Sequence, residues 1–397
     1  MKKNIQIAAS SESADKMRPC ILLVGPFPPP YQGVTLIFQT ILESSLNLEF
    51  NLLPFDMSYG SSKSSPGGEW SFNKMLKNLK RTYKLIKILR KENPQIVYIS
   101  LSQTYLGLIR NSLWILLAKR FSRCIVHLHG SYFRILYNSV NPLVRILIRQ
   151  ALSQVDACIV LSDQFRSMFS GLIPEERIFV VPNGISERTI SHQDFQLAME
   201  RRKTNPLGPL KVVFLSNLFE AKGFGYLLEA AVILAKRGLL NHYCFVLAGA
   251  WESKAVQCKW QAFVQQNLIA NHVYFPGVIS GKDKFQLLLG SDVFVLPTYY
   301  QYEGQPLSII EAMAAGLPII ATDQGCITEM VQDGVNGFIV PQRDAVSIAN
   351  RLEMLRNDPD LRFRMGEASR SLYLHHYTED VCLNALKRVF LQVLQNK

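Results

Sequence analysis

The segment from Asp292 to Gly325 holds the densest group of residues that could bind a polar ligand. A helix is expected to begin near Pro306, because proline suits the first helical position, where its missing N–H would be unpaired. The free N–H groups of Leu307 and Ser308 would then point out of the helix N-terminus, which favours a bound phosphate. Gly304 would let the backbone approach such a ligand closely.

Two carboxylates flank this phosphate-sized site. Glu303 precedes the expected helix, and Glu311 follows eight residues later. Because like charges repel, the pair is a poor ligand set for phosphate, but it suits neutral hydroxyl groups, such as a sugar ring and a ribose diol. Spacing alone is equally compatible with a helix cap at Glu303 and a solvated side chain at Glu311.

The longer block decides between these interpretations. Residues 303–322 read EGQPLSIIEAMAAGLPIIAT, with Gly325 three residues later. This block closely resembles the E-x7-E region of retaining GT-B glycosyltransferases of the group 1, or family 4, type. The resemblance implies that Glu303 contacts the donor sugar and that Glu311 binds the ribose hydroxyls. It also implies that the sugar and diphosphate are held by backbone groups of Gly304, Gln305, Pro306, Leu307 and Ser308.

A second candidate site is the segment LSNLFEAKG, residues 215–223, which follows an expected strand. A lysine in such a loop can neutralise a leaving diphosphate, whereas an ordinary surface lysine at a helix start is mildly unfavourable. Lys222 is therefore a candidate catalytic residue. The related enzymes have G-R-L-x-x-x-K-G here, and Asn217 stands at the arginine position. Asparagine can donate a hydrogen bond but supplies no charge, so pyrophosphate binding would be weaker or compensated by another cation.

The N-terminal half supplies two further candidates. The loop GPFPPPYQGV, residues 25–34, leads into an expected helix from about Val34, and a glycine there can approach a phosphate or sugar. A plain turn is the alternative. The resemblance implies a P-x-x-G-G-type loop that closes over the donor, with Gly33 as its second glycine and Gln32 in place of the first.

Two histidines end another expected strand in the segment VHLHGS, residues 126–131. Alternation places His127 and His129 on the same face, although His129 could already lie in the loop. A metal site would need a third ligand, and none is evident. His127 is interpreted as a hydrogen-bonded structural residue, whereas the resemblance implies that His129 lies near the transferred sugar. Backbone contacts around Val278 are expected to hold the nucleotide base.

Short apolar runs alternate with helical patterns along the whole chain, which indicates an α/β fold with parallel sheets covered on both faces. The expected strands are 20–25, 95–100, 124–129, 156–161 and 178–181, then 211–215, 243–248, 273–275, 292–296 and 318–321. Two Rossmann-like doubly wound domains are expected, with a hinge near residues 185–207. The resemblance implies a GT-B arrangement with an acceptor domain over 1–189, a nucleotide-sugar domain over 190–377, and a helix over 378–397 that crosses back to the first domain.

The formal net charge of +12 is unevenly distributed, because residues 1–190 carry +11 and residues 191–397 only +1. The segment Lys74–Lys91 reads as a cationic amphipathic helix, which favours contact with an anionic membrane over an ordinary solvated face. Aromatic residues are not interleaved as stacking platforms, so nucleic acid is disfavoured. The Asp358-Pro359-Asp360 segment reads as a turn and helix cap rather than a metal site. The seven cysteines form no C-x-x-C pair, and Cys20, Cys124, Cys158 and Cys244 are expected as small core residues of strands in a reducing compartment.

The resemblance thus implies a retaining, hexosyltransferase-like, metal-independent enzyme of cell-envelope polysaccharide synthesis. It would use a nucleoside-diphosphate sugar and a glycan or lipid-linked acceptor. No apolar stretch reaches the length of a membrane span and no signal peptide is evident, so a cytoplasmic or peripheral inner-membrane location is expected. Two alternatives remain. One is a non-catalytic nucleotide-sugar-binding subunit, in which Asn217 at the arginine position would reflect lost activity. The other is a GT-B-fold nucleotide-sugar epimerase.

Overall fold

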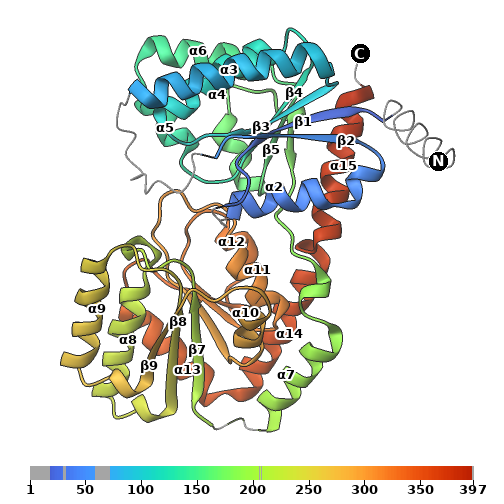
Figure 1. Cartoon of the computed structure of the whole chain (residues 1–397). Coiled ribbons are helices and arrows are strands. Elements are labelled where there is room, and N and C mark those ends of the chain that lie inside the picture. Colours follow the sequence, from blue (N-terminus) through green and yellow to red (C-terminus); the bar gives the residue numbers. More distant parts are fainter. Residues whose placement is uncertain (1–17, 30–32, 59–71, 205, 207, 396–397) are drawn as a thin grey trace, which may run out of the picture. The chain divides into compact units, whose positions relative to one another are not determined.

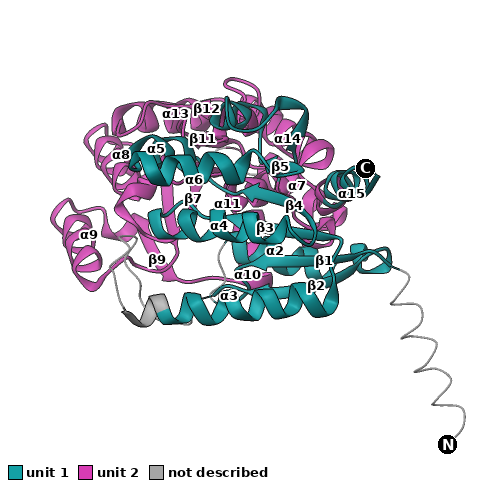
Figure 2. Ribbon diagram, turned by 90° about the horizontal axis from the view of Figure 1, so that it is seen from above, with its two compact units in different colours: residues 1–182, 383–397 teal, residues 183–382 magenta. Residues whose placement is uncertain are grey.

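The computed structural model describes residues 18–29, 33–58, 72–204, 206 and 208–395, without the side chains of 72–75. Gln32 and the serine- and glycine-rich segment 61–68 lie outside the described residues. The chain forms two compact units (Figure 2). Unit 1 comprises the residues up to Pro182 together with those from Leu383, and unit 2 comprises Asn183–Cys382. The division therefore lies seven residues before the expected boundary at 189, and the return to unit 1 lies inside the last helix.

Unit 1 is a six-stranded parallel sheet in the order β2-β1-β3-β4-β5-β6. Its strands are β1 (Cys20–Gly25), β2 (Asn51–Asp56), β3 (Ile96–Leu101), β4 (Arg123–Leu128), β5 (Ala157–Val160) and β6 (Ile178–Val180). The strands β1, β3, β4 and β5 are almost wholly buried, which explains their continuous apolar sequences. The edge strand β2 was not predicted, because it is partly exposed and contains Pro54.

Helices cover both faces of this sheet (Figure 1). On one face lie α3 (Phe72–Glu92), α4 (Tyr105–Ala118) and α6 (Pro142–Leu152), with α5 (Phe133–Ser139) just before α6. On the other face lie α2 (Gly33–Glu43) and the second half of α15 (Glu379–Gln395). The ring of Phe390 in α15 packs edge-on against Phe50 and Tyr98, and Arg123 donates a hydrogen bond to the Leu394 carbonyl. The second half of α15 is therefore an integral part of unit 1.

Unit 2 is a second six-stranded parallel sheet, in the order β12-β11-β10-β7-β8-β9. Its strands are β7 (Leu210–Leu215), β8 (Tyr243–Ala248), β9 (Val273–Gly277), β10 (Val293–Leu296), β11 (Ile319–Ala321) and β12 (Gly337–Ile339). One face is covered by α8 (Phe224–Lys236), α9 (Lys254–Gln266) and α13 (Ala345–Asn357). The other carries α7 (His192–Thr204), α10 (Gly281–Leu289), α11 (Leu307–Ala314) and α14 (Pro359–His376). The three-residue edge strand β12 was not predicted.

The strand order of unit 2 creates a topological switch point. The chain moves outward from β7 through β8 to β9, and then returns to place β10 on the other side of β7. Loops that follow the two central strands diverge at such a point, and ligands of open α/β sheets bind there. The two segments concerned are 216–223 and 297–306, and candidate site residues within them are Asn217, Lys222, Glu303, Gly304, Gln305 and Pro306.

Buried arginines hold the helix layer of unit 2 together. Arg202 donates hydrogen bonds to carbonyls at the ends of α10 and α11, including those of Ser291, Ala315 and Gly316. Arg370 donates to Ala314 in the last turn of α11. Positive charge at a helix C-terminus is favourable, and a guanidinium can satisfy several carbonyls at once. Burial lowers the pKa of Arg202 to about 9, with Asp292 opposing that shift.

The cysteines are free throughout the described chain. Cys20, Cys124 and Cys158 are buried in strands of unit 1, as predicted, and burial raises the pKa of each thiol. Cys244 is only partly buried, so its prediction as a core residue was wrong. Burial raises the pKa of its thiol, and the charge of Lys211, its partner on the neighbouring strand, opposes that shift.

Candidate functional site

At the switch point of unit 2, Lys222 and Glu303 form an ion pair. The Lys222 amine lies 2.7 Å from Glu303 Oε2, and the two side chains are only 15% and 7% exposed. The Thr298 hydroxyl donates a second hydrogen bond to the same oxygen at 3.0 Å. The Lys222 amine also lies 4.8 Å from the ring centre of Tyr300. The carboxylate and the ammonium are therefore held in fixed positions by the loop after β10.

Two helices begin beside this pair. Helix α8 starts at Phe224 after Gly223, and α11 starts at Leu307. Pro306 is the N-cap with extended backbone, so its prediction as the first helical residue was wrong by one position. The first N–H groups of a helix have no carbonyl partner inside it, so the amides of Leu307 and Ser308 remain available for an anion.

Gly223 explains how the two loops come so close. Its φ is +80°, and a Cβ there would lie 1.9 Å from the Pro297 carbonyl oxygen at the end of β10. Any other residue would therefore both strain the backbone and collide with the neighbouring strand. The glycine packs α8 against the end of β10 and so brings Lys222 to the carboxylate.

The second carboxylate of the block, Glu311, is also paired with a lysine. Lys284 of α10 approaches Glu311 Oε1 to 2.5 Å, and their side chains are 19% and 8% exposed. Burial raises the pKa of Glu311, and the Lys284 charge opposes that shift. Glu311 is therefore not a solvated surface residue, nor is Glu303 the cap of α11. Lys284 was missed by the sequence analysis, because nothing in its local sequence marks a residue that meets Glu311 in space.

Backbone and amide contacts fix the loop between the two carboxylates. The Gln305 side chain accepts a hydrogen bond from the Asn183 N–H at 2.6 Å, and the Asn183 amide donates to the Gln305 carbonyl. The Cys326 N–H donates to the Gly304 carbonyl, and Gly325 has a φ of +63° with no room for a Cβ against Glu303 and Gly304. The side chain of Gln305 is thus engaged in holding the loop. Gly325, which belongs to the quoted sequence block, supports the same loop, and Asn183 is a support that the sequence did not indicate.

The remaining residues predicted in this unit lie on exposed loops. Asn217 follows β7 and is exposed. Val278 follows the edge strand β9 and is 71% exposed. Its loop leads directly into α10, which carries Lys284. Asp358 caps α14 by accepting the Leu361 N–H at 2.8 Å, as predicted. Among the residues that the structure describes, no group of three or more His, Cys, Asp and Glu side chains is arranged to hold a metal ion.

In unit 1, His127 and His129 stack at the end of β4, with ring centres 3.9 Å apart. The Tyr98 hydroxyl hydrogen-bonds His127 Nδ1, which agrees with the prediction of a structural role. Both ring nitrogens of His129 are shielded from solvent and meet no hydrogen-bond partner in the described part of the chain. Burial lowers the pKa of His129 to about 3, so its ring is neutral at neutral pH.

Gly33 is the first residue of α2, and an added Cβ there would meet no atom of the described residues within 4 Å. It stands at the switch point of unit 1, where β1 has β2 on one side and β3 on the other. Its place at an accessible helix N-terminus is consistent with the predicted ligand contact.

Comparison with known proteins decides the family. Residues 197–372 match the family model described as glycosyl transferases group 1, and residues 63–188 match the model of glycosyltransferase family 4. The chain belongs to the group 1 glycosyltransferases. Its two Rossmann-like units form the GT-B fold, as predicted. HepE of Anabaena, solved in complex with UDP, has a TM-score of 0.72 and 16% identity, covering 94% of this chain and 100% of HepE.

Several curated relatives of this glycosyltransferase are named for the synthesis of polysaccharides or of lipid-linked glycans. WcaL of Salmonella typhimurium, named for colanic acid biosynthesis, is 28% identical over 53% of this chain and 50% of its own length. This chain thus matches only about half the length of the first such relatives. An Escherichia coli relative is 25% identical, over 81% of this chain and 82% of its own length. It is named a UDP-Gal:alpha-D-GlcNAc-diphosphoundecaprenol alpha-1,3-galactosyltransferase.

Proposed function

We propose that this glycosyltransferase transfers a sugar, with retention of anomeric configuration, from a nucleoside-diphosphate sugar to a hydroxyl of a glycan or lipid-linked acceptor in cell-envelope polysaccharide synthesis. The observation that carries the proposal is the Lys222–Glu303 pair, which lies at the switch point of unit 2 beside two helix N-termini. Such a place provides cationic and N–H groups for a diphosphate and a carboxylate for sugar hydroxyls.

In the proposed reaction the bond between the anomeric carbon and the diphosphate oxygen breaks, and a bond to the acceptor oxygen forms on the same face. Lys222 and the amides of Leu307 and Ser308 stabilise the negative charge that develops on the departing diphosphate. The leaving phosphate accepts the acceptor proton. Glu303 binds hydroxyls of the donor sugar and is not a covalent nucleophile.

Glu311 is proposed to bind the ribose hydroxyls, with Lys284 holding its carboxylate in place. Loop contacts near Val278 are proposed to hold the base, and Asn217 to donate a hydrogen bond to the diphosphate. His129 and Gly33, both in unit 1, are proposed to approach the sugar and the donor phosphates respectively. The low pKa of His129 suits a neutral hydrogen-bonding role at neutral pH.

A thermal-shift series with UDP, GDP and ADP tests the nucleotide site directly. UDP is the first candidate, because HepE binds UDP and the E. coli relative is named for UDP-galactose. One nucleotide at 100 times its Kd should stabilise the protein by about 2.7 kcal/mol. No stabilisation by any of the three at millimolar concentration would contradict the proposed site.

We further propose that the reaction needs no metal ion, because a lysine and helix N-termini stabilise the negative charge of the diphosphate. Turnover in excess EDTA should equal turnover in buffer without added metal. A loss of turnover in EDTA that Mg²⁺ or Mn²⁺ restores would show that a divalent ion shares this role.

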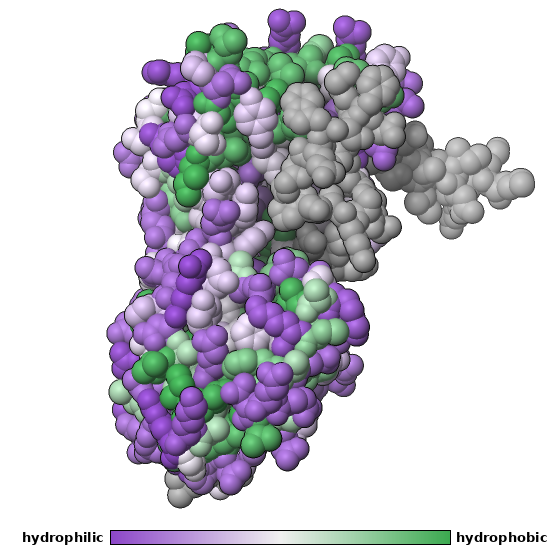
Figure 3. Space-filling view, turned by 90° about the vertical axis from the view of Figure 1, so that its left-hand side faces the viewer, coloured by the Kyte–Doolittle hydropathy of each residue, from purple (hydrophilic) through white to green (hydrophobic). Residues whose placement is uncertain are grey.

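We also propose that unit 1 rests on an anionic membrane surface, which would place the enzyme on the inner face of the plasma membrane. The described residues contain no helix long and apolar enough to cross a membrane. However, apolar side chains are exposed on the helix layer α3, α4 and α6: Leu79 and Tyr83 on α3, Leu113 on α4, and Leu143 and Ile146 on α6. Figure 3 shows hydrophobic residues gathered at the top of this unit.

The basic residues of α3 lie among these apolar positions. Lys80 lies between Leu79 and Tyr83 in the sequence of this helix, Lys77 precedes them and Lys87 follows them, and all three lysines are exposed. Each basic residue close to an anionic leaflet contributes about 1 kcal/mol, and exposed leucines add buried apolar area. Sedimentation with phosphatidylglycerol vesicles at low salt should exceed that with phosphatidylcholine vesicles at least tenfold. Equal binding to both lipids would contradict the proposal.

A further inference from the structure

The outer face of unit 2 carries a groove that the proposed donor site does not use. Two adjoining cavities of about 530 and 510 Å³ lie over α8, one toward α9 and the other toward α13. Glu229 and Phe263 line both cavities, so the two adjoin, and together they are called the groove here. Each volume is in the range of a small-molecule site, and together they suit an extended ligand.

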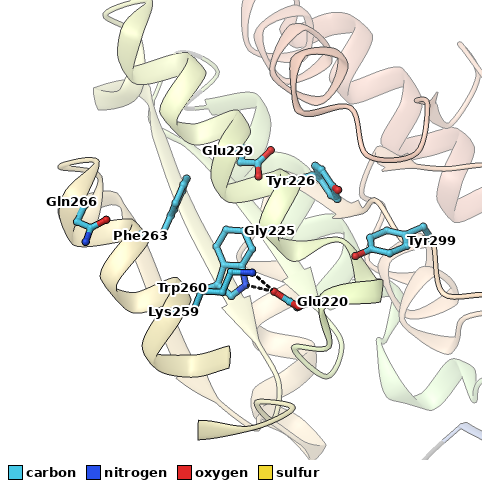
Figure 4. Close-up of a pocket in the computed structure, with 9 residues that line it drawn as sticks. All are labelled: Glu220, Gly225, Tyr226, Glu229, Lys259, Trp260, Phe263, Gln266 and Tyr299. Atoms are coloured by element: carbon cyan, nitrogen blue, oxygen red, sulfur yellow. Dashed lines mark hydrogen bonds and ion pairs between the residues drawn. The ribbon is translucent and has the colours of Figure 1, made fainter. Parts of the chain in front are cut away.

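Aromatic side chains line one end of this groove (Figure 4). Tyr226 projects from α8, Trp260 and Phe263 from α9, and Tyr299 from the loop after β10. The rings of Tyr226 and Tyr299 lie edge to face, with centroids 6.0 Å apart, and those of Trp260 and Phe263 are 5.2 Å apart. The faces of such aromatic rings pack well against flat ligand surfaces that carry C–H groups.

Charged and amide side chains also line the groove, and its acidic and basic residues are equal in number. The groove is lined by three acidic residues, Glu220, Glu229 and Asp344, and by three basic residues, Lys236, Lys259 and Arg343. Gln266 and Asn267 add amides that both donate and accept hydrogen bonds. A cationic ligand would need an excess of carboxylates, and an anionic one an excess of cations. The balance therefore favours an uncharged ligand rich in hydroxyl groups.

The Glu229 carboxylate is available to accept hydrogen bonds from such a ligand. Glu220 is paired with Lys259 at 2.5 Å, and Asp344 accepts the Ser347 amide as the cap of α13. Arg343 lies over the ring of Tyr299, 4.5 Å from its centre. Glu229, at the centre of the groove, meets no hydrogen-bond or ion-pair partner among the described residues, and burial raises its pKa.

We infer that this groove is a second saccharide-binding site, which holds an uncharged oligosaccharide of several units apart from the donor site. Apolar faces of the sugar rings lie on Tyr226 and Phe263, and sugar hydroxyls donate to Glu229. The groove begins beside the donor site, because Tyr299 is adjacent to Tyr300, whose ring lies under Lys222. A segment of a glycan polymer has the uncharged, hydroxyl-rich character that this lining favours. Its binding would keep the enzyme on a glycan surface.

An array of uncharged oligosaccharides, including gluco-, galacto- and mannohexaoses and N-acetylglucosamine hexamers, tests this inference with the full chain. Binding should be at least tenfold stronger for hexamers than for monosaccharides. Phe263→Ala and Glu229→Gln should each weaken it at least tenfold. The matched control is Phe363→Ala, which removes a partly exposed aromatic ring from α14 on the opposite face and should leave binding unchanged.

The thermal stabilisation of each variant by UDP, GDP and ADP is measured in parallel. This measurement separates the inference from the proposed function, and it confirms that the variants are folded. Loss of hexamer binding with nucleotide stabilisation intact supports the groove. The inference would be overturned if no hexamer bound, if all three variants bound alike, or if only cationic sugars or an amphipathic peptide bound in their place.

Discussion

The amine of Lys222 lies 2.7 Å from the carboxylate of Glu303, although 81 residues separate them in sequence. The strand order explains this meeting, since β7 and β10 are neighbours and each side chain is in the loop that follows one of them. In the absence of donor, the pair satisfies both charges. A diphosphate that entered the site would compete with Glu303 for the same ammonium group, which links donor binding to the position of the carboxylate.

Replacement of Lys222 separates its electrostatic and structural roles. Lys222→Met removes a charge-assisted contact and should weaken nucleoside-diphosphate binding about 10- to 100-fold. It also leaves Glu303 buried without its ion pair, which should lower the free energy of unfolding by about 1–3 kcal/mol. Titration calorimetry and urea unfolding measure the two effects.

The double variant Lys222→Met/Glu303→Gln provides the control. Because the neutral amide no longer needs a cation, it should recover part of the lost stability but none of the nucleotide affinity. Recovery of the affinity as well would show that the lysine acts only through Glu303.

The two carboxylates should affect different steps. Glu311→Ala removes the proposed ribose contact and should raise the donor Kd about 10-fold or more, whereas Glu303→Ala should mainly lower turnover. Donor titration and measurement of initial rates distinguish the two. Unchanged affinity and rate in both variants would refute the assignment of the site.

Lys284 should set the pH dependence of donor binding. Burial raises the pKa of Glu311 and Lys284 opposes it, so Lys284→Met should raise that pKa further. A larger fraction of Glu311 is then protonated at lower pH, and the loss of donor affinity should be greater at pH 6 than at pH 8. Lys282→Met, an exposed lysine two residues earlier in α10, is the control. A loss that is equal at both pH values would mean that Lys284 contacts the nucleotide itself.

Acid should destabilise unit 1 through His129. Its pKa is about 3 in the folded chain and about 6.5 when unfolded, so between these values only the unfolded state binds the proton. Stability therefore falls as pH falls through this range. Between pH 7 and pH 5 the wild type should lose about 2 kcal/mol more than His129→Gln.

Urea unfolding at the two pH values measures this difference. The exposed His375→Gln of α14 serves as the control and should behave as the wild type does. Equal acid losses in the wild type and His129→Gln would contradict the burial of a neutral imidazole.

The sequence was most informative where strands are buried on both faces. The continuous apolar runs of β1 and β8 predicted both strands with their observed bounds. The edge strands β2 and β12 were missed, because edge positions are short or partly exposed and lack that signal. The E-x7-E block indicated Glu303 and Glu311, but only one of their two lysine partners could be predicted from the sequence. Lys222 stands in a recognisable loop, whereas Lys284 is brought to Glu311 only by the packing of α10 on α11. The groove over α8 could not be predicted, since its lining comes from four separate segments.

The most direct test of the account is release of nucleoside diphosphate from UDP-, GDP- and ADP-sugars, with and without a bacterial lipid extract as acceptor source. The proposed transferase activity predicts release from one donor that depends on the extract, a sugar-bearing lipid product, and loss of both in Glu303→Gln. Nucleotide-sugar binding with no release from any donor would indicate a non-catalytic binding subunit and contradict the account. Conversion of the donor without any acceptor would contradict it in favour of an epimerase.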